Sequence, residues 1–338
     1  MKSGSPESRP VFHFHIGRST MLSTFLRRIG LYALTLFLAS LFVFVATEVL
    51  PGDALEVSLT ADEIAMMNPE DLARKRSDLG LDRPAPVRYA EWLAGAVRGD
   101  FGKTILGGTP VIDIIREPVK NSLLLAVVTA LVAIPASLVL GIIAAYWRGR
   151  LPDRLASMGA VIGYSIPEFA SGNLLVLIFA IWIPLFPAVI LAFADAPPST
   201  LLAVSVLPVA TIVFGSIAHL VQLIRTGLIE ALSSDYVERA RFTGLGELRL
   251  ILRHALPASV IPALNSAALY VAGLLGGIVV VEKVFGYPGL GMILLQAVDK
   301  REVPIVQAVS LLAALAVVTM NLLADLAVVA LDPRARSR

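Results

Sequence analysis

Polar side chains inside long apolar runs are the residues of this sequence that could do chemistry. Such groups are costly in lipid, so each needs a partner or a wet cavity. Glu168 directly follows Pro167, where a proline frees backbone carbonyls and makes a cavity natural, so we expect Glu168 to face a wet pathway. Asn265 and Tyr270 are further candidates for contact with a transported solute, and Asp325 is expected to make an interhelical contact. The remaining polar groups within apolar runs are Asn173, His219, Gln222 and Asn321.

Motifs of catalysis and nucleotide binding are absent from the sequence. It contains no G-x-x-x-x-G-K-[ST] phosphate loop, no H-E-x-x-H and no G-x-S-x-G. It has no cysteine, which excludes disulfides, zinc–thiolate sites and cysteine nucleophiles. The net charge of +2 is too small to suggest nucleic-acid binding. We therefore expect a chain that is no enzyme and holds no cofactor or metal of its own.

The stretch "YVERARFTGLGELRLILRHALP", residues 236–257, is densely charged and lies between long apolar runs. Asp235 followed by Glu238 predicts a helix capped by the Asp carboxylate, and Gly244 is expected to end that helix in the left-handed conformation. A second helix would follow and close at Pro257. Its predicted apolar face consists of Leu248, Ile251, Leu252 and Ala255. Two such amphipathic helices could simply lie on a membrane surface.

Membrane helices are the elements that must position these residues. The mean hydropathy is +0.79 and only 16% of the residues are charged, against about a quarter in soluble domains. Six segments are long enough to cross a hydrocarbon core of about 30 Å. They are Gly30–Leu50, Ser122–Trp147, Leu155–Trp182, Leu201–Leu223, Ala258–Val281 and Pro304–Leu331. We therefore predict an all-α integral membrane protein with six transmembrane helices.

The basic residues predict the orientation of these spans. Sixteen of the 28 Lys and Arg residues lie in the N-terminal flank, the loop after the second span, the charged stretch with its approach, and the C-terminus. The loop around Asp195 has none. Because short cytoplasmic loops carry the excess of Lys and Arg, both termini and the charged stretch are expected to face the cytoplasm.

The chain divides into four parts by composition. We predict a disordered tail over 1–20, the first span with an external segment over 21–117, a five-helix core over 118–331 with a cytoplasmic loop at 233–257, and a short tail over 332–338. The external segment should contain short helices in "TADEIAMMNPEDLARKRSDLGL" and in "VRYAEWLAGAVRGDFG". In the fifth span, Gly273 and Gly277 form G-x-x-x-G, which permits close helix packing within the chain or against a partner chain.

The charged stretch resembles the EAA loop of ABC importer permeases, a Glu-Ala-Ala segment followed by a glycine and a Leu-Pro pair. Arg239 and His254 depart from this pattern, and the form with Arg241 is similar to the peptide/nickel branch. The residues that match the pattern are Glu238, Ala240, Gly244, Leu256 and Pro257. Other segments that resemble this branch are "LPGD", "LGLDRP", "RGDFG", "VEKVFGYPGLG", "REVPIVQ" and "LDPRAR", and they occur in the expected order from residue 50 to residue 336.

This resemblance implies a type I ABC importer permease in the bacterial inner membrane. A second homologous permease would supply the other half of the pathway, and an external substrate-binding protein would deliver the cargo. Two ABC ATPase subunits carrying ATP and Mg would bind the loop at 233–257, which would act as a coupling helix. The branch imports di- and oligopeptides, nickel chelates, glutathione and other small solutes.

Two other classes of function remain open at this point. An ion-coupled secondary carrier would need a buried site for the coupling ion, and its uptake would survive ATP depletion but collapse with the proton gradient. A channel or scaffold would show no energised accumulation of solute. The few carboxylates inside the spans and the coupling-loop motif argue against both classes.

Overall fold

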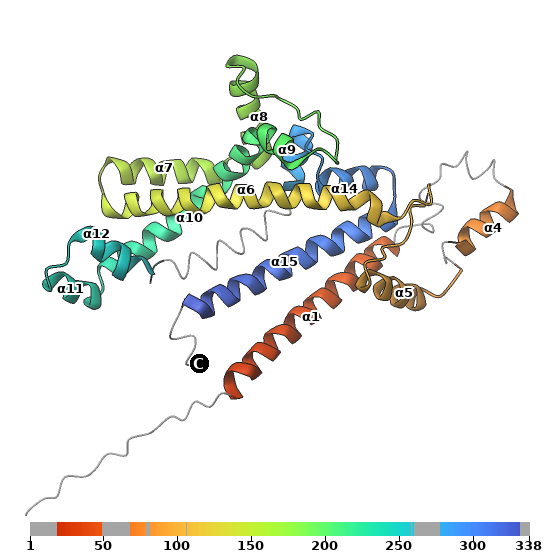
Figure 1. Ribbon diagram of the computed structural model, residues 1–338, viewed down its shortest axis with the longest axis horizontal. Helices are drawn as coiled ribbons and strands as arrows, with labels where there is room; N and C mark the ends of the chain where they lie inside the picture. The colour runs from red at the N-terminus through yellow and green to blue at the C-terminus, as the bar shows by residue number, and fades with distance from the viewer. Residues whose placement is uncertain are drawn as a thin grey trace, which may run out of the picture.

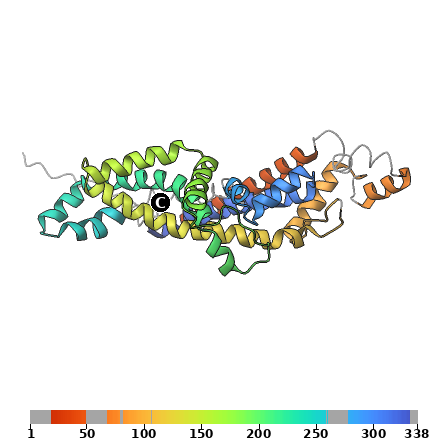
Figure 2. The ribbon, with the colours of Figure 1, turned by 90° about the horizontal axis from the view of Figure 1, so that it is seen from above.

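The computed structural model describes residues 19–48, 68–78, 82–105, 107–257, 259 and 278–331. Within these ranges every regular element is a helix, and the β-type pairing is limited to one isolated bridge between Lys103 and Pro110. The molecule is elongated, and Figures 1 and 2 both place α11 and α12 at one end and α4 at the other. The N-terminal half comprises α1 (Ser19–Glu48), α4 (Pro69–Asp78), α5 (Ala85–Val97), α6 (Val111–Tyr146), α7 (Leu151–Ser165), α8 (Glu168–Val176) and the π-helix η1 (Leu177–Trp182). The C-terminal half comprises α9 (Pro198–Val204), α10 (Val206–Leu232), α11 (Asp235–Phe242), α12 (Glu247–Leu250), the π-helix η2 (Ile251–Ala255), α14 (Leu290–Asp299) and α15 (Val303–Leu331).

Among the described residues, four single helices are long and apolar enough to cross a membrane. They are Leu26–Thr47 within α1, all of α6, all of α10, and Val303–Leu323 within α15. Two bent helix pairs raise the number of candidate spans to six if each pair is one span. The first, second and sixth predicted spans are therefore confirmed as helices, although α6 begins well before Ser122. The fourth is confirmed from Val206 on, since its first residues belong to the separate helix α9.

The third predicted span, Leu155–Trp182, is wrong as a single helix. The chain bends by 105° between α7 and α8 (Figure 1). Pro167 has no N–H to continue the helix, and the residue before a proline is driven toward extended geometry. Ile166 accordingly has φ −94° and ψ 121°. This predicted span is a broken helix with its break directly before Glu168.

The fifth predicted span, Ala258–Val281, lies largely outside the described residues. Its end is seen as a helical segment, Ile278–Phe285, which meets α14 at a bend of 82°. The predicted residues Asn265, Tyr270, Gly273 and Gly277 also lie outside the described residues. At the N-terminus, α1 begins at Ser19, two residues inside the predicted tail.

The helices pack along the length of the molecule. α10 lies against α6 and α7, and α1 lies against α15 (Figure 1). Gly141 of α6 allows a close approach to α10, since a Cβ there would lie 2.6 Å from Ile224 Cγ2. The contact of α1 with α15 includes Asp325, which accepts a 2.6 Å hydrogen bond from Tyr32 Oη and pairs with Arg28 Nη1 at 3.0 Å. The expected interhelical role of Asp325 is confirmed.

Short helices in the predicted external segment are also confirmed. α4 falls inside the first quoted stretch, and α5 begins at Ala85, two residues before the second. Tyr89 and Trp92 of α5 stack against Phe44 of α1, with ring centroids 5.3 and 6.1 Å away. Tyr89 Oη also shares a 2.8 Å hydrogen bond with Ser40 Oγ. α5 is thereby fixed to the C-terminal half of α1.

Candidate functional site

The charged stretch begins with α11, and its predicted cap is wrong. Ser234 is the N-cap residue and Asp235 is already helical, with no side chain capping the helix. The Ser234 carbonyl instead accepts the backbone N–H groups of Val237 and Glu238 at 3.1 Å each. The predicted end is confirmed, because Gly244 has φ +80° and donates its N–H to the Arg241 carbonyl at 3.0 Å.

The second helix of the stretch differs from the prediction in both its end and its face. It changes from α12 to the π-helix η2, in which the Leu256 N–H bonds to the Ile251 carbonyl, and Pro257 is still helical. A π-bulge accommodates a proline in a helix, because the widened turn relieves its missing N–H and its clash with the preceding turn. The predicted face is confirmed in part: Ile251 and Ala255 are buried together with Leu250, whereas Leu248 and Leu252 are 70% and 49% exposed.

One side of this stretch is anchored in the helix bundle. Val237, Leu250 and Ala255 are fully buried and pack with Ala145 near the end of α6 and Leu228 near the end of α10. The two halves of the stretch are joined by an ion pair of Arg241 Nε with Glu247 Oε1 at 3.1 Å and by a 3.5 Å contact from Tyr236 Oη to the His254 carbonyl. The stretch therefore moves with the ends of α6 and α10.

The other side is an exposed surface, which we call the loop surface. It combines apolar side chains with charged ones, and Phe242 is the most exposed of its apolar members at 82%. Its apolar members are Tyr236, Phe242, Leu248 and Leu252, and its charged members are Glu238, Arg239, Arg241, Glu247, Arg249 and Arg253. Large apolar side chains gathered on an exposed surface indicate a contact with lipid or protein.

The residues that match the EAA pattern are spread over this stretch. Glu238 and Arg241 are exposed on α11, and Ala240 is half-buried on its inner side. Leu256 and Pro257 lie at the far end of η2, where Leu256 is half-buried and Pro257 is exposed. The structure thus places both ends of the motif on one compact unit built on α6 and α10.

A second candidate region is the break between α7 and α8. A cavity of about 410 Å³ lies there, lined by both sides of the break and by α10. Its polar side chains are Tyr164, Glu168 and His219. Glu168 lies over Gly215, since a Cβ on that glycine would be 3.5 Å from Glu168 Cγ. Glu168, which we expect to face a wet pathway, lines this cavity.

The sequence reasoning missed a buried carboxylate at the other bend. Glu282 is fully buried and accepts hydrogen bonds from Ser122 Oγ at 2.5 Å, from the Gly291 N–H at 2.6 Å and from the Met292 N–H at 3.3 Å. Ser122 Oγ in turn accepts the Leu290 N–H at 2.8 Å. Glu282 thereby caps α14 and ties it to α6. The glycines of "VEKVFGYPGLG" were the available signal for this buried carboxylate. Gly289 leaves the space that the carboxylate occupies, since a Cβ on Gly289 would lie 2.0 Å from Glu282 Oε1.

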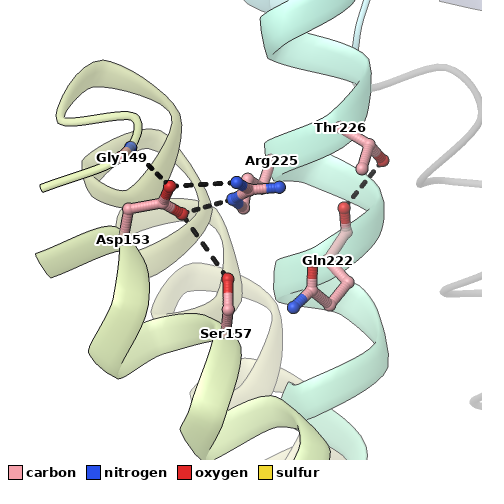
Figure 3. A network of polar contacts seen from close by, with 6 residues as sticks. All are labelled: Gly149, Asp153, Ser157, Gln222, Arg225 and Thr226. Carbon is pink, nitrogen blue, oxygen red and sulfur yellow. Dashed lines mark hydrogen bonds and ion pairs between the residues drawn. The ribbon is translucent and has the colours of Figure 1, made fainter.

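A second missed network joins α7 to α10. Asp153 binds Arg225 through both of its oxygens, with Arg225 Nη2 at 2.9 Å from Oδ2 (Figure 3). The Gly149 N–H donates to the same Oδ2 at 2.8 Å, and Ser157 Oγ lies 3.5 Å from Oδ1. Only 6% of the Asp153 side chain is exposed. Both charges looked like ordinary loop charges in the sequence, and only the turn after α6 brings them together.

No metal centre is formed by the described part of the chain, where no group of three or more His, Asp or Glu side chains could hold an ion. The two candidate regions are accordingly an exposed surface and a cavity.

Two models of known protein families match this chain. Residues 137–337 match the model of the binding-protein-dependent transport system inner membrane component, and residues 21–110 match the N-terminal domain of such membrane components. The chain is 34% identical over 316 residues to the glutathione transport system permease protein GsiC of Escherichia coli strain K12. It has the same identity to the protein of that name from Shigella flexneri serotype 5b, and in both cases 94% of this chain and 99% of the relative are covered. The chain therefore belongs to the family of binding-protein-dependent transport system inner membrane components, and it is a non-catalytic, membrane-spanning permease subunit of an ABC importer.

Proposed function

We propose that this chain forms half of the translocation pathway of an ATP-driven peptide importer and that the loop surface docks on a partner ATPase. This proposal rests on the difference between the two sides of the loop, one exposed and one buried against the membrane helices. Phe242 and Leu248 are 82% and 70% exposed, whereas Val237 and Leu250 behind them are fully buried against α6 and α10. A partner that binds the exposed side can therefore shift the membrane helices.

The charges of the loop surface suit a protein partner. Glu238 and Arg239 add charges of both signs beside the exposed Phe242. An apolar centre with a charged rim is typical of protein interfaces, where buried aromatic side chains contribute most of the affinity. The partners are two ATPase subunits that bind ATP and Mg at the cytoplasmic face, a second homologous permease and an external substrate-binding protein. Both termini of this chain then lie in the cytoplasm.

The cargo that we propose is a small peptide, with glutathione as the first to test. The relatives with 34% identity over 94% of the chain are named as glutathione transport permeases. Glutathione is itself a tripeptide, so it lies within the peptide class that the motif pattern indicates. Nickel chelates are the alternative cargo, and competition between labelled glutathione and dipeptides or chelated nickel separates the alternatives.

The coupling role is tested in proteoliposomes that contain the complete transporter. Glu238→Lys reverses a charge on the loop surface, and Gly244→Asp places a side chain at φ +80°, where only glycine is relaxed. We expect both variants to insert at wild-type levels and to lose ATP-dependent uptake at least tenfold. Normal uptake by both variants would remove the coupling assignment.

The docking itself is tested by co-purification of the ATPase subunits. Phe242→Asp should release them, since it places a charge in the centre of the apolar surface. Phe193→Asp is the matched control, because Phe193 is also highly exposed, at 84%, but lies on the loop between η1 and α9. Equal ATPase recovery with both variants would show that the loop surface is not the docking site.

A further inference from the structure

The cavity at the break between α7 and α8 contains an acidic side chain, although it lies in a candidate span. It has a volume of about 410 Å³, and Glu168 is the acid among its lining residues. No Lys or Arg belongs to the described residues that line it, which are Gly163, Tyr164, Ile166, Pro167, Glu168, Gly215 and His219. A carboxylate at this depth is costly unless a cation or a donor is near it.

The Glu168 carboxylate is positioned for contact with a molecule in the cavity. Pro167 is the N-cap residue of α8, so Glu168 is the first residue after the break. The carboxylate lies beside Gly215 of α10, since a Cβ there would be 3.7 Å from Glu168 Oε1. His219 follows Gly215 by one turn of α10 and therefore shares its face. Within the described part of the chain, neither the Glu168 carboxylate nor the His219 ring has a hydrogen bond or ion pair.

Backbone carbonyls add acceptors to the same place. Pro167 has no N–H to donate to the carbonyl of Gly163. Because α8 restarts in a new direction, the last carbonyls of α7 lose their helical donors, and the C-terminal end of a helix carries partial negative charge. The cavity thus combines a carboxylate, an imidazole, a phenol and a helix C-terminus. Broken helices of this kind mark binding sites in membrane transporters.

We propose that this cavity binds the primary ammonium group of the cargo during its passage. An ammonium group brings one positive charge and three N–H donors. Glu168 would accept one N–H, the free end of α7 a second, and a ring nitrogen of His219 a third. One carboxylate and one imidazole are too few ligands for a divalent metal ion. The identification of the ammonium with that of a peptide rests on the proposed function.

A direct binding test does not depend on the cargo. The complete transporter is placed in lipid nanodiscs, and its thermal stability is measured with propylammonium chloride or tetramethylammonium chloride. Both cations carry one charge, but tetramethylammonium has no N–H donor. We expect propylammonium to raise the melting temperature more than tetramethylammonium, and Glu168→Gln to remove this difference. Asp195→Asn is the matched control, since Asp195 is an exposed acid outside the cavity, and it should retain the difference.

Transport of matched peptides then tests the role of the cavity. Glutathione has a free amine, and N-acetylglutathione has the same backbone without it. We expect Glu168→Gln to lower the uptake of glutathione at least tenfold relative to N-acetylglutathione, and His219→Gln to lower it less. An equal loss for both peptides, or no loss for either, would overturn the proposal.

The two tests separate this inference from the proposed function. If the wild-type transporter imports neither peptide, the proposed cargo is wrong, and the nanodisc measurement alone decides whether the cavity binds ammonium. If propylammonium stabilises the wild-type protein no better than tetramethylammonium, the cavity is not an ammonium site, whatever peptide is imported.

Discussion

The two bends of this molecule each have a glutamate beside them, and the two glutamates differ in every contact. At the 82° bend, Glu282 is fully buried and accepts three hydrogen bonds from α6 and α14. At the 105° bend, Glu168 is half-buried and faces a cavity. A carboxylate whose acceptor positions are filled by its own chain holds the fold together, whereas one that faces a cavity is available to a ligand.

Removal of Glu282 is expected to have the largest effect on stability. Glu282→Ala leaves Ser122 Oγ and the N–H groups of Gly291 and Met292 without their acceptor, and each buried donor without a partner costs about 1–3 kcal/mol. The apparent free energy of unfolding in detergent should fall by about 4 kcal/mol. Glu282→Gln keeps one acceptor oxygen and should lose about half as much. A loss below about 1 kcal/mol for the alanine variant would mean that the bond network is not structural.

Overpacking at the 82° bend should have the next largest effect on the free energy of unfolding. In Gly291→Ala the new Cβ would lie 2.5 Å from Val279 Cα, which is backbone and cannot rotate away. We expect a loss of about 2–3 kcal/mol from overpacking. The matched control is Gly215→Ala at the open bend, where the nearest atom is Glu168 Cγ at 3.5 Å, an ordinary contact distance. If both substitutions lowered the free energy of unfolding by the same amount in one denaturation assay, the two bends would not differ in packing.

The anchor between α7 and α10 should give an intermediate effect. Asp153→Ala leaves the guanidinium of Arg225, whose side chain is 21% exposed, without its carboxylate partner. We expect a loss of about 2 kcal/mol, less than for a fully buried pair because water still reaches Arg225. The double variant Asp153→Ala with Arg225→Met should recover part of this loss, as measured by the same denaturation. Additive losses in the double variant would show that the pair is not coupled.

Glu168 itself should have the smallest effect on stability. Glu168→Ala removes a carboxylate that accepts no hydrogen bond within the described part of the chain, so the free energy of unfolding should change by less than about 0.5 kcal/mol. The expected consequence is confined to ammonium binding and transport. If Glu168→Ala destabilised the protein as much as Glu282→Ala, both glutamates would stabilise the fold and the contrast between them would be wrong.

The sequence predicted the membrane helices well because hydropathy over twenty residues is a local property. The helices at Leu26–Thr47 and Val303–Leu323 overlap the first and sixth predicted spans. Pro167 lies where the third predicted span breaks. The bend at Pro167 was not predicted, because a proline in a membrane helix is compatible with both a kink and a full break. Its direction depends on how α8 packs against α10.

The candidate site was predictable in part for the same reason. The glycine stop at Gly244 follows from residues next to it in the chain, and it is confirmed. The face of the second helix was predicted in part: Ile251 and Ala255 are buried as expected, whereas Leu248 and Leu252 are exposed. Which side is covered depends on how the loop packs on α6 and α10. Glu282 was missed because its partner Ser122 lies 160 residues away in the chain. Contacts of that range are set by the packing of α6 against α14.

The continuity of α10 connects the two candidate regions mechanically. The helix runs without a break from Val206 to Leu232, with Leu228 under the loop surface and His219 in the cavity wall. These two residues are nine positions apart on one continuous helix, or about 14 Å. We expect a helix of this length to be stiff, so that a tilt at one end also moves the other. We therefore expect a displacement imposed on the loop to change the shape of the cavity, and a solute held at Glu168 to resist that displacement in return.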